Sequence, residues 1–304
     1  MGVESTLDGQ TNRRHAYERT SPCVAIAFFS LFCSESRTCM RRIMRNIYIG
    51  LFIPLRGIFR IVSPSKEVCV LFYHSISESQ DPFSISPIDF EKQLMLLRHV
   101  ANPVSLSDIV SYVKGDKDLP DGSVAVTFDD GYQDIVTTAL PILHRYRIPA
   151  TVFVSVDPLK NELGNAHELL THDDIRHLSQ DPLIEIGSHA ITHKKLTRLA
   201  DHEVRFELQQ SKDKIESITG KPCRYIAYPK GSVNPKVRFL TQNAKYVAGV
   251  CIKQGMVYPN MDPFLIKRIV VQKGIGAFAF RWRMTRIMDW LAVFDTTLQK
   301  LWRR

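Results

Sequence analysis

Short apolar segments alternate with amphipathic segments along residues 67–271. Apolar, β-prone runs predict strands at 67–73, 124–128, 151–156, 183–187, 224–228, 246–251 and 264–271. Patterns with helical spacing predict helices at 88–100, 105–113, 134–146, 171–179, 197–219 and 234–243. Ser86 and Thr171 stand where N-terminal capping residues are expected. Strands that alternate with helices indicate an α/β protein with a parallel sheet or a barrel.

The strand predicted before residue 129 ends in two adjacent carboxylates. The sequence SVAVTFDDGYQD places Asp129 and Asp130 directly after an apolar run, and Gly131 follows them. Neighbouring side chains on a strand point to opposite faces, so two adjacent acids can serve one site only where the backbone turns. Gly131 permits such a turn. An ordinary polar turn after a strand explains the same residues equally well.

A second strand end carries two histidines, His189 and His193, in the sequence EIGSHAITH. One carboxylate with two imidazoles is a common ligand set for a catalytic metal that keeps a position open for water. Nitrogen and oxygen ligands of this kind suit zinc, with iron, cobalt or nickel as alternatives. The second carboxylate of the pair would then be free to act as a base.

TFDDG followed by SHxxTH resembles the polysaccharide deacetylases, the NodB-homology group of metal-dependent carbohydrate de-N-acetylases. The sequence AYPKG at 227–231 is similar to a variant of the third motif of that family. Tyr73 and His74 resemble the YH motif of a permuted subgroup. The resemblance covers about residues 68–271 and implies an α/β fold, an irregular (β/α)7 barrel.

The resemblance implies a role for each matching residue. Asp130, His189 and His193 are expected to bind a divalent metal, with zinc favoured. Asp129 is expected to act as the general base that takes a proton from water, and His74 as the general acid.

The third motif departs from the common pattern of the family. That pattern carries an arginine that orients the catalytic aspartate, and AYPKG lacks it. Arg268, from the last predicted strand, is expected to take this role, as in the permuted subgroup. Tyr228 and Gly231 are expected to contact the substrate or the oxyanion through the backbone.

The predicted activity is the metal-dependent removal of an N-acetyl group from an amino sugar in a polysaccharide or a lipid-linked glycan. An O-acetyl esterase on the same scaffold is one alternative. A non-catalytic carbohydrate-binding protein is another, although the expected base, ligand triad and acid are all present.

The net charge of +9 is uneven along the 304 residues, because arginines gather towards both ends. We expect a disordered or apolar region at 1–39, a basic amphipathic segment that anchors to a membrane at 40–63, the deacetylase domain at 67–275 and an amphipathic helix at 276–304. These ends predict peripheral membrane contact. No nucleic-acid-binding motif is found in the sequence. Scattered cysteines that we expect to be reduced favour the cytoplasmic face, and export is the alternative.

Overall fold

The computed structural model describes residues 66–157, 168–286, 288 and 289. The predicted segments 1–39 and 40–63 and the last part of the predicted C-terminal helix lie outside these residues. Among the helices in the described ranges, none is long and apolar enough to cross a membrane.

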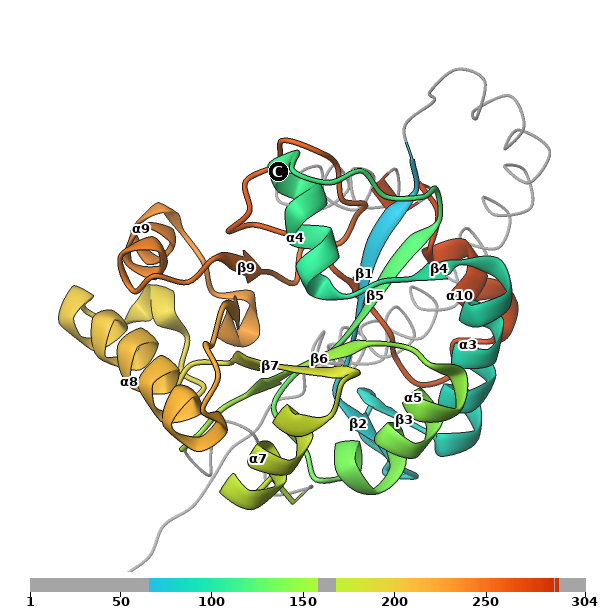
Figure 1. The fold of residues 1–304 in the computed structure, drawn as a ribbon, viewed down its shortest axis with the longest axis horizontal. Coiled ribbons are helices and arrows are strands. Elements are labelled where there is room, and N and C mark those ends of the chain that lie inside the picture. Colours follow the sequence, from blue (N-terminus) through green and yellow to red (C-terminus); the bar gives the residue numbers. More distant parts are fainter. Residues whose placement is uncertain (1–65, 158–167, 287, 290–304) are drawn as a thin grey trace, which may run out of the picture. The chain divides into compact units, whose positions relative to one another are not determined.

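A parallel sheet forms the centre of the described domain (Figure 1). Along the sheet the strand order is β10-β1-β5-β6-β7-β8-β9, and every neighbouring pair is parallel. The strands are β1 (Val68–Tyr73), β5 (Ser123–Phe128), β6 (Ala150–Val154), β7 (Ile184–Ser188), β8 (Tyr225–Ala227), β9 (Ala248–Val250) and β10 (Ile269–Val270). A short strand, β4 (Asn102–Pro103), also pairs with β5.

The segment 263–271 joins the two edges of this sheet. The backbone N–H of Gly249 donates to the Pro263 carbonyl at 2.9 Å, at the edge formed by β9. Further along the same segment, the N–H of Val271 donates to the Phe72 carbonyl of β1 at 3.1 Å. The sheet therefore curls into an irregular barrel, which confirms the predicted fold class.

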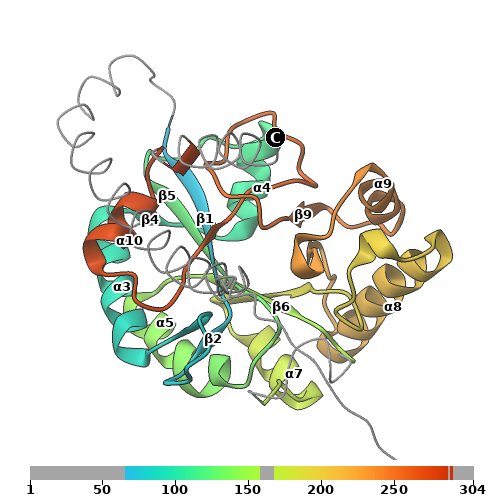
Figure 2. The ribbon, with the colours of Figure 1, turned by 180° about the vertical axis from the view of Figure 1, so that it is seen from behind.

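Helices surround the curled sheet, as the front and back views show (Figures 1 and 2). They are α3 (Pro87–Val100), α4 (Leu106–Lys114), α5 (Leu140–Tyr146), α7 (His172–Gln180), α8 (Asp201–Thr219), α9 (Pro235–Asn243) and α10 (Ala277–Arg283). The predicted caps are present: Ser86 caps α3, and Thr171 forms a capping box with Asp174 at the start of α7. The sequence did not predict the two-residue strands β2 (Ser75–Ile76) and β3 (Ser84–Ile85).

The two faces of the sheet belong to two hydrophobic clusters. Val70 of β1 lies in one cluster with Ile109 of α4, whereas the next residue, Leu71, lies in the other cluster with Phe90 of α3. This alternation explains why β1 is apolar at every position.

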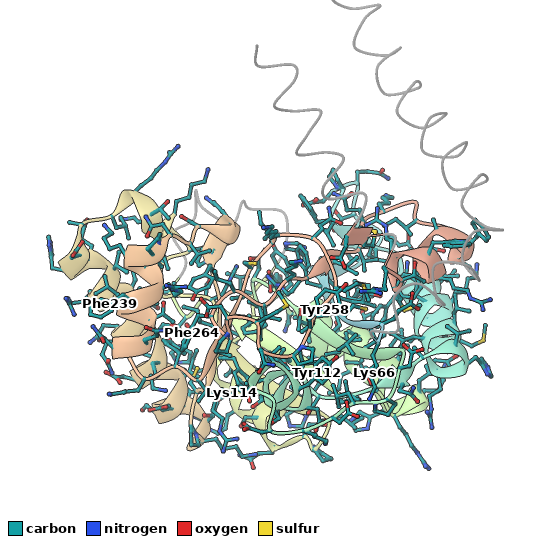
Figure 3. The ribbon with its side chains drawn as sticks, turned by 90° about the horizontal axis from the view of Figure 1, so that it is seen from above. Lys66, Tyr112, Lys114, Phe239, Tyr258 and Phe264 are labelled. Carbon is teal, nitrogen blue, oxygen red and sulfur yellow. The ribbon has the colours of Figure 1, made fainter. Side chains whose placement is uncertain are left out.

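The amino end of β1 and the candidate site lie at opposite ends of the strands. Figure 3 looks onto the amino end, where Lys66 lies just before β1, and Tyr112 and Lys114 lie on α4. His74, Asp129 and His189 each follow a strand directly, so they gather at the carboxyl end.

Candidate active site

A backbone turn brings the adjacent carboxylates to one end of the barrel. β5 ends at Phe128. Asp130 then adopts φ 72° and Gly131 adopts φ 77°, so both lie in the left-handed region. The turn at Gly131 was expected from the sequence, whereas the left-handed Asp130 was not. Left-handed backbone is costly for a residue other than glycine and persists only where its surroundings hold it.

Asp129 forms a buried, bidentate ion pair with Arg268. The two guanidinium nitrogens lie 2.6 and 2.7 Å from the two carboxylate oxygens of Asp129. Arg268 is fully buried, donates from Nε to the Cys251 carbonyl at 3.3 Å, and lies 4.3 Å from the centre of the Phe72 ring. The structure therefore brings Arg268 onto Asp129, from the segment that joins the edges of the sheet.

The ion pair keeps Asp129 charged. Burial by itself would raise the pKa of this carboxyl, but the charge of Arg268 and its hydrogen bonds outweigh burial and lower the pKa to about 2. Asp129 is therefore an ionised carboxylate throughout the neutral pH range.

Asp130, His189 and His193 form a compact, buried cluster of possible metal ligands. Their ligand atoms all lie within 4.8 Å of one another. Oδ1 of Asp130 is 3.5 Å from Nε2 of His189 and 3.3 Å from Nε2 of His193. Tetrahedral ligands of zinc, about 2.0–2.2 Å from the ion, lie about 3.3–3.5 Å apart. The three residues therefore fit a divalent cation, although these distances do not distinguish zinc from other metals.

Nε2 of His189, the ring nitrogen that faces Asp130, carries no proton and is therefore able to bind a metal. Nδ1 of His189 lies 2.7 Å from the Ala227 carbonyl, and a carbonyl can only accept, so Nδ1 carries the proton. Burial lowers the pKa of His189 to about 4, although the charge of Asp129 opposes this shift, so the ring is neutral. Burial and the charge of Asp129 raise the pKa of Asp130 to about 7, a shift that a bound cation would reverse.

His74 lies at the edge of the same site. Its Nδ1 is buried and has no hydrogen-bond partner among the residues described. The ring centre is 5.6 Å from that of Phe72 and 4.9 Å from that of Phe83. Burial lowers the pKa of His74, and the charge of Asp129 opposes the shift. The His74 imidazole is thus placed where the charge of Asp129 acts on it.

A cavity of about 200 Å³ opens between His74 and the ligand cluster. Asp81, Phe83 and Tyr132 also line it, and the sequence analysis did not single out any of them. Tyr132 hydrogen-bonds to Asp130. Only Tyr132 had a signal in the sequence, since it directly follows the DDG turn; Asp81 and Phe83 lie in the unpredicted connection between β2 and β3.

Tyr228 and Gly231 have other partners in the fold. The N–H of Tyr228 donates to the Val250 carbonyl at 3.2 Å, and the N–H of Gly231 donates to the Tyr228 carbonyl at 2.8 Å. Their predicted contact with an oxyanion therefore stays a prediction, and it would require at least one of these bonds to open.

Comparison with known proteins identifies one family. The sequence profile described as "Polysaccharide deacetylase" matches residues 116–249. A poly-beta-1,6-N-acetyl-D-glucosamine N-deacetylase from Staphylococcus aureus is 26% identical over 212 residues, which cover 66% of this chain and 72% of that protein.

Solved structures agree on the fold. IcaB from Ammonifex degensii superimposes with a TM-score of 0.66 at 22% identity, over 73% of this chain and 98% of that one. BC0361, a polysaccharide deacetylase from Bacillus cereus, superimposes with a TM-score of 0.60 at 25% identity, over 72% of this chain and 69% of that one. Over these residues the chain is similar in sequence and fold to the polysaccharide deacetylase, or NodB-homology, family.

Proposed function

We propose that this enzyme hydrolyses the N-acetyl group of an amino sugar within a polysaccharide, with Asp129 as general base and His74 as general acid. One observation carries the proposal: adjacent carboxylates have opposite environments. Asp129 is paired with Arg268 and stays charged, whereas Asp130 faces the imidazoles of His189 and His193. Carboxylates whose pKa values are separated in this way are typical of sites that divide chemical roles between them.

Asp130, His189 and His193 would hold a divalent cation, with zinc the first choice. A cation bound there would polarise the acetamide carbonyl and lower the pKa of a water molecule. The protein supplies fixed ligand positions, because the Ala227 carbonyl sets the tautomer of His189.

Asp129 receives the proton that the attacking water loses. Arg268 lowers the basicity of Asp129 and at the same time fixes the direction of both carboxylate oxygens. A weak base is sufficient only when the water is already acidified, so the two adjacent aspartates are expected to work as a unit.

His74 gives a proton to the departing amine nitrogen. An amine is a poor leaving group unless it is protonated, whereas the alcohol released from an ester needs less assistance. A histidine on the cavity wall, close to Asp129 but outside the ligand cluster, therefore favours an amide over an O-acetyl ester.

The S. aureus relative makes a polymer of N-acetylglucosamine the first substrate to test. We would measure bound metal together with acetate release from β-1,6-linked and β-1,4-linked N-acetylglucosamine oligomers, and from an O-acetylated sugar. The variants are Asp130→Ala and, as a control, Asp116→Ala, which changes an exposed aspartate on the loop after α4.

We expect the wild type and Asp116→Ala to bind metal and release acetate from an amide substrate, and Asp130→Ala to do neither. Faster release from the O-acetylated sugar would favour the esterase. Metal binding without release from any amide or ester substrate would contradict the proposed reaction, and absence of both would favour a carbohydrate-binding protein.

A further inference from the structure

Glu207, on the buried side of α8, binds the loop that carries His193. Glu207 is only 4% exposed. One of its carboxylate oxygens accepts hydrogen bonds from the backbone N–H groups of Ile191 and Thr192, both at 2.9 Å, and the other accepts from the Thr192 hydroxyl. Charge-assisted bonds of this kind are stronger than bonds between neutral groups. The carboxylate therefore holds two consecutive peptide groups between the two candidate ligand histidines.

The two histidines are fixed in different ways. His189 directly follows β7, and its N–H donates to the Val154 carbonyl of β6 at 2.8 Å, so the sheet sets its place. His193 lies four residues further on, beyond the strand. Ala190 and His193 both have left-handed backbones, with φ of 59° and 62°. Such a loop keeps its shape only if its surroundings hold it.

Most of the contacts that hold the loop come from α8. Besides Glu207, the Ser211 hydroxyl donates to the Ala190 carbonyl at 3.1 Å and lies 2.7 Å from the Ser188 hydroxyl. One further bond comes from the N–H of Asp157, which donates to the Ile191 carbonyl at 3.0 Å. The place of His193 relative to the sheet is thus determined mainly by the buried polar face of α8.

We propose that Glu207 is a positioning residue, which holds Nε2 of His193 at ligand distance from Asp130 and so sets the affinity and geometry of the metal site. The proposal rests on the metal-dependent function proposed above. Glu207 touches none of the candidate ligand side chains through the bonds described; it acts through the backbone of residues 191 and 192. Residues that hydrogen-bond metal ligands typically change the metal affinity by about 10–100-fold when they are lost, and we expect an effect of this size for Glu207.

Two substitutions at this position separate hydrogen bonding from packing. Glu207→Leu fills the same space in the core with an apolar side chain and removes both acceptor oxygens. The N–H groups of Ile191 and Thr192 therefore lose their partners. Glu207→Gln keeps one acceptor for the two N–H groups and can donate its amide to the Thr192 hydroxyl, which is also able to accept. Gln is therefore the variant expected to restore the site.

Glu216 offers a matched control on the same helix. Its Oε1 accepts a hydrogen bond from the N–H of Cys223 at 3.0 Å, and thus holds the loop at the far end of α8. Glu216→Leu removes a similar bond between carboxylate and backbone without touching the loop of His193. It measures the loss of stability that comes from α8 alone.

The experiment titrates each metal-free protein with Co²⁺ in competition with a chelator. It also records the visible d–d spectrum of the bound ion and the thermal unfolding of the metal-free form. We expect Glu207→Leu to bind Co²⁺ about 10–100-fold more weakly, with an altered spectrum. Glu207→Gln and Glu216→Leu should stay within a few-fold of the wild type and keep its spectrum. If Glu207→Leu does not fold, Glu207→Asp, which shortens the side chain by one methylene, should show a smaller loss in the same direction.

An unchanged affinity and spectrum in Glu207→Leu, or in Glu207→Asp if only that variant folds, would overturn the positioning role, even if the unfolding temperature falls. Equal losses in Glu216→Leu would overturn it as well. A wild type that binds no Co²⁺ would overturn both this role and the proposed metal-dependent function. A wild type that binds Co²⁺ but releases no acetate would count against the proposed reaction alone, since the positioning role is read from binding.

Discussion

The two halves of the candidate site are built around the adjacent residues Asp129 and Asp130, whose carboxylates lie in opposite electrostatic environments. On one side, both oxygens of Asp129 are bound by Arg268, and the pKa of Asp129 is lowered to about 2 although burial opposes it. On the other side, Asp130 faces two imidazoles, and burial together with the charge of Asp129 raises its pKa to about 7. Two adjacent aspartates thus have very different pKa values, because their surroundings differ.

The comparison shows which half depends on an added ion. The pair of Asp129 and Arg268 is complete within the protein, because opposite charges meet with bidentate geometry. The cluster around Asp130 collects three groups that are common metal ligands. We therefore expect the two halves to respond differently to substitution, to metal removal and to pH.

The largest effect is expected for Asp129→Asn. The amide cannot take a proton, so kcat for acetate release should fall by about 10²–10⁴, the usual contribution of a general base. Metal affinity should change little, because Asp129 is not in the ligand cluster. Steady-state kinetics and metal titration of the same preparation test both points. Retained activity would show that Asp129 is not the base.

Arg268→Met should be the most destabilising change in the site. It leaves a buried carboxylate without its partner, and breaking a buried pair in this way costs about 3–5 kcal/mol. Denaturant unfolding measures the loss, and Arg268→Lys, which keeps the charge but not the two parallel bonds, should recover part of it. A loss below about 1 kcal/mol would mean that Asp129 takes up a proton or finds another partner.

Asp130 should make the metal-free protein less stable as the pH rises, whereas the lowered pKa of His189 acts in the opposite direction over the same range. The pKa of Asp130 is raised from 3.8 to about 7 in the folded state, so the folded state binds the proton more tightly than the unfolded state. The contribution of Asp130 to the free energy of unfolding, measured as the difference between the wild type and Asp130→Asn, should therefore fall between about pH 4 and pH 7, by on the order of 2–4 kcal/mol.

A divalent cation should remove that loss at pH 7–8, and Asp130→Asn should lack it without metal. Unfolding curves at several pH values, with and without metal, provide the measurement. For Asp129 the sign is opposite: its lowered pKa contributes stability that is present above about pH 4 and is lost as the pH falls towards 2. A stability difference between metal-free wild type and Asp130→Asn that rises between pH 4 and pH 7 would contradict the environment described for Asp130.

The smallest effect, and the most selective, is expected for His74→Ala. Acetate release from an amino sugar should slow by at least about tenfold, the lower range for a general acid. Release from an activated ester, whose leaving group needs no proton, should change far less. Comparing kcat for the two substrates isolates this step, and equal losses on both would argue against an acid role for His74.

Local sequence patterns predicted most of the regular structure. Apolar runs such as 67–73 become strands, and the caps at Ser86 and Thr171 begin helices, because both signals act over a few residues. The strands β2 and β3 were missed, because two residues carry no periodicity. The predicted end segments lie outside the described residues, so the predicted membrane contact and cellular location stay predictions.

The sequence by itself determined the kind of fold and the chemical groups at the strand ends. A buried strand, a turn glycine and a ligand motif can each be recognised from a few neighbouring residues. Only the tertiary structure decided how those groups differ. Arg268 meets Asp129 across 139 positions of the chain, and Glu207 reaches the loop before His193 from a helix that looked merely polar. Electrostatic environment is a sum over everything that packs nearby, so it arises only when distant segments come together in the folded barrel.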